Sequence, residues 1–183
     1  MSVKKHTQKE IGAFLKQEIE SLEFVDKYRG QLDAQGIFTF PRPAVFISFA
    51  RFEWESTVDG SQRGQGLIKF RIVVENYADS YEGSVNQDLA LEFFDFNEKV
   101  HEALQGLSGT YFSSLNRKTD EDDEDHGNVI VTIMEYETTL VDNSACETKN
   151  YVLVDPALNV EYKNKQEFPV ATPETPAFII PLD

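Results

Sequence analysis

Six consecutive carboxylates are the most conspicuous chemical feature of this 183-residue chain. The tract consists of Asp120, Glu121, Asp122, Asp123, Glu124 and Asp125. Carboxylate oxygens bind hard cations such as calcium, but the spacing does not match an EF-hand loop. With the loop glycine placed on Gly127, His126 takes the fifth position and Ile133 the place of the essential glutamate. Because adjacent like charges repel each other, the tract predicts a solvated loop at a hairpin tip, with cation binding or an electrostatic role in an assembly as alternatives.

The histidines and the closely spaced glutamates lack the arrangement that metal binding or catalysis requires. The histidines fall on a terminus, a helix face and a loop: His6, His101 and His126. Helix-borne metal sites place two ligands three or four residues apart, which no pair of these does. Two glutamate pairs each share one strand face: Glu53 with Glu55, and Glu135 with Glu137. Acid–base catalysis also needs a pocket that separates their pKa values. The sequence therefore predicts no catalytic, cofactor-binding or metal-binding residue, and a carboxylate or metal hydrolase is the weakest functional alternative.

Charge and cysteine content exclude further classes of protein. The chain has 17 basic and 32 acidic residues, which gives a net charge of −15. Such acidity disfavours binding to nucleic-acid phosphates or to anionic membrane surfaces. No apolar run approaches the roughly 20 residues that cross a bilayer. The single cysteine, Cys146, excludes an internal disulfide, and no apolar stretch follows the basic first residues, so we expect a cytoplasmic protein without a secretory signal.

Apolar periodicity predicts an α-β-β-α-β-β order, hence an α+β fold. Two stretches with helical spacing cover residues 7–25 and 85–107, each opened by a capping-box pattern. Strands are expected over 44–55 with a bulge, 67–76, 111–115 and 128–141, with a turn region at 57–66. This order predicts an antiparallel sheet of about four or more strands with both helices on one face.

The same periodicity predicts the core and the division of the chain. The expected core residues are Phe14, Leu15, Ile19, Leu89, Phe93, Phe96, Val100 and Leu104 from the helices, and Ile68, Phe70, Ile72 and Val74 from a strand. Residues 1–141 are expected to form the α+β domain. Five of the seven prolines lie after residue 155, so 142–183 is expected to be an irregular extension that packs on the domain or on a neighbour.

The order and texture of these elements resemble the tail-terminator (tail-completion) proteins of long-tailed bacteriophages and prophages. The likeness spans residues 7–141 and is carried most by three stretches: LIKFRIVVE at 67–75, FFDFNEKV at 93–100 and VIVTIMEYE at 129–137. The resemblance implies a non-enzymatic structural protein that forms a ring, commonly a hexamer, and joins the tail tube to head-connector proteins. It also implies a protein that is cytoplasmic during assembly and then part of the virion.

Loops and termini are freest to reach a neighbouring subunit, which directs attention to two segments. The expected assembly contacts are Asp59 and Arg63 near the hairpin tip, and Phe178, Ile179 and Ile180 near the C-terminus. Arg63 could pair with a carboxylate of a neighbouring subunit and so set register. The competing interpretation is an acidic binding module, such as an immunity-type protein or DNA mimic that occupies a basic partner.

Overall fold

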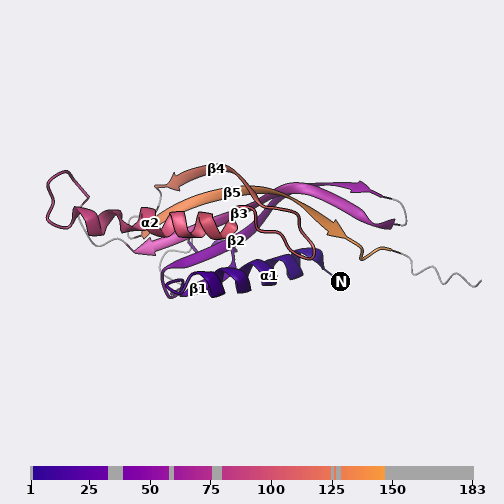
Figure 1. Ribbon diagram of the computed structural model, residues 1–183, viewed down its shortest axis with the longest axis horizontal. Coiled ribbons are helices and arrows are strands. Elements are labelled where there is room, and N and C mark those ends of the chain that lie inside the picture. The colour runs from indigo at the N-terminus through magenta and orange to yellow at the C-terminus, as the bar shows by residue number, and fades with distance from the viewer. Residues whose placement is uncertain are drawn as a thin grey trace, which may run out of the picture. The chain divides into compact units, whose positions relative to one another are not determined.

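A mixed sheet of five strands, in the order β1-β2-β3-β5-β4, forms the centre of the computed structural model (Figure 1). The strands are Phe24–Lys27 (β1), Ala44–Ser56 (β2), Gln62–Glu75 (β3), Asn116–Asp123 (β4) and Val129–Asp142 (β5). The structure describes residues 2–32, 39–57, 60–75, 80–124, 126 and 129–146. All of them belong to a compact unit of residues 1–148.

The α+β class is confirmed, and the predicted antiparallel sheet and element order are matched in part, because β2, β3, β5 and β4 pair antiparallel but the sheet has one further, parallel strand. β1 precedes β2 and runs parallel to it, with Phe24 opposite Ala44 and Lys27 opposite Ile47. The first helix, α1 (Val3–Glu18), ends well before the predicted residue 25. A four-residue strand is too short to show a periodic pattern, so the predicted helix wrongly includes Phe24 and Val25, the apolar residues of β1.

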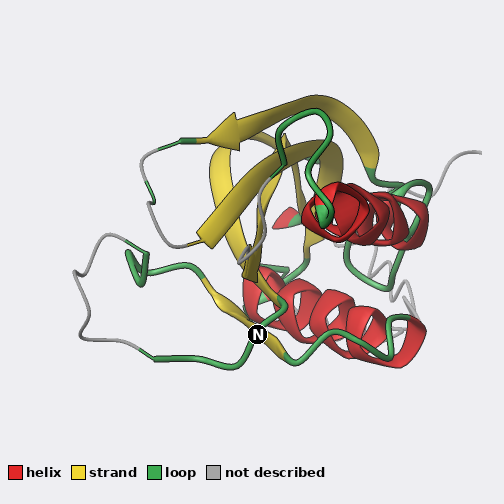
Figure 2. Cartoon of the chain, turned by 90° about the vertical axis from the view of Figure 1, so that its left-hand side faces the viewer, coloured by secondary structure: helices red, strands yellow, loops and turns green. Residues whose placement is uncertain are grey.

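Both helices pack on the same face of the sheet, which Figure 2 shows end-on. α1 contributes Ile11 and Leu15 to this core, and α2 (Gln87–Leu104) contributes Val100 and Leu104. Neither predicted capping box forms. Thr7 lies buried inside α1, and the residue before α2 makes no side-chain capping hydrogen bond.

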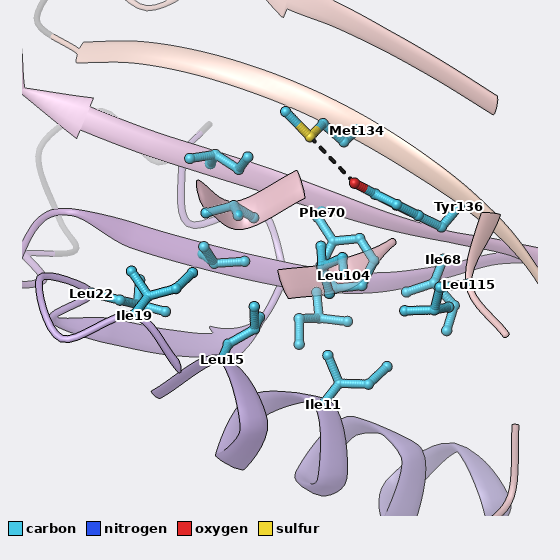
Figure 3. Packing of buried hydrophobic residues seen from close by; sticks show 14 of the residues in the cluster. Ile11, Leu15, Ile19, Leu22, Ile68, Phe70, Leu104, Leu115, Met134 and Tyr136 are labelled. Carbon is cyan, nitrogen blue, oxygen red and sulfur yellow. Dashed lines mark hydrogen bonds between the residues drawn. The ribbon is translucent and has the colours of Figure 1, made fainter. Parts of the chain in front are cut away.

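Most of the predicted core is confirmed (Figure 3). The buried members are Leu15, Ile19, Ile68, Phe70, Ile72, Phe96, Val100 and Leu104. Phe14, Val74 and Phe93 are half-buried. The prediction for Leu89 is wrong, because its side chain is 59% exposed. Leu89 lies in the first turn of α2 and lines an open cavity with Val74 and Ile130, so its side chain faces this opening and is not enclosed in the core.

The acidic tract is an edge strand, so its prediction as a loop is wrong for residues 120–123. Asp120 lies opposite Met134 and Asp123 opposite Val131, within the β4–β5 pairing. Every position of β5 is buried or half-buried, and its outer backbone groups need partners that β4 supplies. Charged side chains are common on edge strands because they discourage unwanted pairing. Glu124 lies in the following turn, and Asp125 lies outside the described residues.

The region predicted as a turn at 57–66 is shorter than expected, because β3 begins at Gln62. The predicted bulge in β2 is confirmed by the register shift between Phe49 and Phe52. Gly64 belongs to the strand, where a Cβ would lie 2.7 Å from the ring of Trp54. The absence of a side chain at Gly64 therefore leaves room for the Trp54 ring to pack against the strand. The strand predicted at 111–115 is reduced to one bridge, between Phe112 and Leu140.

Candidate functional site: the two edges of the sheet

Among the described residues, strand pairing covers only a short part of the outer edge of β2. β1 covers β2 only from Ala44 to Ile47, and the N–H of Tyr28 donates to the Ile47 carbonyl oxygen immediately beyond. From Ser48 to Ser56 no strand in the described part of the chain pairs with this edge. Backbone groups on an edge that no described strand covers can pair with a further strand.

An aromatic row accompanies this open edge. Phe49, Phe52 and Trp54 are half-buried against the main core, with successive ring centroids 6.2 and 6.3 Å apart. The shift at the bulge brings Phe49 into line with the two later residues. The ammonium of Lys4, from α1, lies 5.3 Å from the Phe52 ring centroid, within the range of a cation–π contact. The edge thus combines unpaired backbone, half-covered aromatic rings and a positive charge.

The opposite edge of the sheet carries β4 and, beside it, α2. Between them lies a cavity of about 280 Å³ whose lining includes Phe94, Glu98, Asp120 and Asp122. Phe94 is 55% exposed. The sequence places these residues in separate segments, and only the pairing of β4 with β5 brings the strand carboxylates beside the acidic helix. This convergence of charge was missed at the sequence level.

A buried hydrogen-bond chain holds β4 in this position. The Asn97 side-chain amide donates to the Thr132 hydroxyl across 2.9 Å, and that hydroxyl donates to the Asp122 carboxylate across 3.0 Å. Asn97 and Thr132 are both buried, so each needs its partner. These two hydrogen bonds connect α2, β5 and β4 and fix the distance between the carboxylates of α2 and β4.

His101, the histidine on the face of α2, is half-buried. Its Nδ1 lies 2.8 Å from the hydroxyl of Tyr136, a fully buried side chain on β5. Burial and the nearby Arg117 guanidinium lower the pKa of His101 below 6.5, and burial raises the pKa of Tyr136. The two rings are therefore mainly neutral at pH 7. No short motif signals this pair, because its members lie 35 residues apart and meet only through tertiary packing.

Of the two glutamate pairs considered for acid–base catalysis, Glu135 and Glu137 bind different partners, and Glu53 forms a surface ion pair. Glu135 forms an ion pair with Lys69, whose hydrogen bond lowers the Glu135 pKa. Glu137 forms one with Lys118 at 2.6 Å. Glu53 pairs with Arg51 at the surface across 3.0 Å, with both side chains largely exposed. These carboxylates stabilise cross-strand and surface contacts and do not converge in a pocket.

The predicted assembly residues fall in different places. Arg63 lies on β3, exposed, opposite Glu55 of β2 and Val141 of β5. Asp59, Phe178, Ile179 and Ile180 lie outside the described residues, so their predicted contacts stay predictions.

The described residues contain neither a metal-binding group nor a helix suited to a membrane. No group of three or more histidine, cysteine or acidic side chains in this part of the chain is arranged to hold a metal ion. Among the helices described, none combines the length and apolarity that crossing a bilayer requires. Comparison of the sequence with protein-family models and with curated proteins finds no match.

Proposed function

We propose that this protein is a ring-forming structural component of the tail-terminator or head–tail connector type. The observation that carries the proposal is the open outer edge of β2 from Ser48 to Ser56, bordered by half-covered aromatic rings. An open strand edge is a ready surface for pairing with another chain. A closed ring satisfies such edges in every subunit without leaving one exposed.

The placement of the two edges supports a cyclic assembly. β2 and β4 lie toward opposite sides of one sheet and differ in composition, so a contact between them is head-to-tail. Head-to-tail contacts generate rings when the rotation closes. The resemblance of the element order to tail-terminator proteins supports the same function, with a hexamer as the expected number of copies and with tail-tube and head-connector proteins as partners. On this proposal the protein has no catalytic activity, is cytoplasmic during assembly and ends in the virion.

Light scattering coupled to size exclusion over a wide range of protein concentration tests this function. We expect a concentration-dependent increase in mass to a single closed species, visible as a ring by negative-stain electron microscopy. Tail tubes of the phage that encodes the protein should shift it to the ring at lower concentration. A monomer at the highest concentration, with and without tail tubes, would refute the proposal.

An acidic binding module is the second candidate, and the folded acidic edge favours it. α2 contains five acidic residues and one lysine, and its neighbour β4 adds Asp120, Glu121, Asp122 and Asp123. A folded face with many carboxylates can occupy the basic site of a partner. This function predicts a stable monomer that binds a basic protein one-to-one, so the same sizing experiment separates it from the ring.

A further inference from the structure

Charge is distributed unequally between the two sides of the sheet. α1 contains four lysines and two glutamates, the reverse of the balance in α2. The acids are concentrated beside β4. We call Glu98 together with residues 120–124 the acidic edge.

The lysines of α1 lie toward the side of β1 and β2. A Cβ on Gly12 would lie 3.5 Å from Val25 of β1, so this side of the helix faces that strand. Lys5 and Lys9 precede Gly12 by seven and three residues and therefore share its side of the helix. Lys4 contacts the aromatic row of β2. Lys27 ends β1, opposite the last covered position of β2.

We call Lys4, Lys5, Lys9 and Lys27 the basic edge. All four are exposed, and none forms an ion pair with a described residue. By contrast, the two cations of β4 are engaged within the subunit: Arg117 with Asp120 at 3.1 Å and Lys118 with Glu137. The positive charge of the basic edge is thus available to a partner, and the acidic edge keeps an excess of negative charge.

We infer that the acidic edge of one copy docks on the basic edge of the next, so that charge sets the direction of the ring. This inference rests on the proposed function and assigns its interface. A chain with a net charge of −15 repels its own copies, and association is favoured only where unlike surfaces meet. Phe94, which lines one cavity with Glu98 and Asp120, then packs near the aromatic row of β2 beside the basic edge, and this contact supplies an apolar centre with a charged rim.

Reversing the charges of each edge tests the direction of contact. The first variant carries Lys5→Glu, Lys9→Glu and Lys27→Glu, and the second Glu98→Lys, Glu121→Lys and Glu124→Lys. These positions are exposed, so both variants should fold. A control, Glu18→Lys with Glu20→Lys and Glu23→Lys, makes the same change in net charge as the second variant, at exposed positions outside both edges.

Each reversed variant should associate at least about tenfold more weakly than the natural sequence, with unchanged circular dichroism. The control should retain association. Mixing the two variants should restore it, because each reversed edge then meets a complementary one. One chain carrying all six substitutions should also associate, and added salt should weaken every one of these contacts.

The outcomes separate the interface from the function. If the natural chain forms a ring and both reversed variants form it equally well, the proposed interface is wrong and the proposed function stands. Loss of association in both variants without rescue on mixing would also overturn the interface. If the natural chain stays monomeric, the proposed function itself fails, and binding of a basic protein to the acidic edge would then favour the second candidate.

Discussion

Two leucines on α2 provide the sharpest test of the packing described above. Leu104 is fully buried in the main core, whereas Leu89 is 59% exposed, although the sequence pattern assigned both to the core. They lie at opposite ends of one helix, so replacement by alanine makes the same chemical change in both places. Leu104→Ala removes buried methyl groups and leaves a cavity, which costs about 3–4 kcal/mol in the free energy of unfolding. Leu89→Ala should change it by less than about 0.5 kcal/mol.

Urea titration and thermal unfolding at low protein concentration measure this difference without a contribution from association. For a unit of 148 residues, the expected loss for Leu104→Ala corresponds to about 10 °C in the melting temperature. Leu89→Ala should leave the melting temperature nearly unchanged. A loss below about 1 kcal/mol for Leu104→Ala, or equal losses for the two variants, would refute the placement of α2 on the sheet.

Three further substitutions test local features. Gly12→Ala should stabilise the protein by about 0.5–1 kcal/mol in urea titration, because it removes a glycine from a helix interior and its methyl group meets Val25 at an ordinary 3.5 Å. Gly66→Ala should destabilise it by about 1–3 kcal/mol and alter Trp54 fluorescence, because the new Cβ would overlap the Arg51 carbonyl oxygen; an unchanged midpoint would contradict the close approach. The lowered pKa of His101 means that the folded state favours the neutral ring, so its contribution is complete above pH 6.5 and is lost as the pH falls through the folded-state value. Melting temperatures measured from pH 7.5 downward should therefore fall less steeply below pH 6.5 for His101→Gln, and identical slopes would exclude this role.

The long periodic segments could be predicted because each presents one face to the core. Ile68, Phe70 and Ile72 alternate along β3, and all three lie buried under the helices. Leu15 and Ile19, four residues apart, are buried on the same side of the chain. Where one face of an element is covered along its length, local spacing is sufficient to identify the buried residues.

Local spacing failed where tertiary contacts outweigh local preference. Repulsion among its carboxylates predicts that the acidic tract forms a solvated loop. Residues 120–123 instead form a strand, because their backbone pairs with that of β5. Leu89 follows the helical spacing of the core residues, but it borders an open cavity and its side chain stays exposed. β1 forms because its four residues pair in parallel with the first four residues of β2, and no periodic pattern in the sequence predicts this pairing.

The sequence by itself determined the α+β class, the main helices and strands and the strongly negative charge, because these follow from composition and from short-range periodicity. Only the tertiary structure decided which strand edge is open and which charges lie together. Glu98 and Asp120 line one cavity, and Asn97 reaches Thr132, through the packing of α2 on β5 and the pairing of β4 with β5. These contacts join residues that are distant along the chain, and their register is set by the burial of whole faces of the sheet.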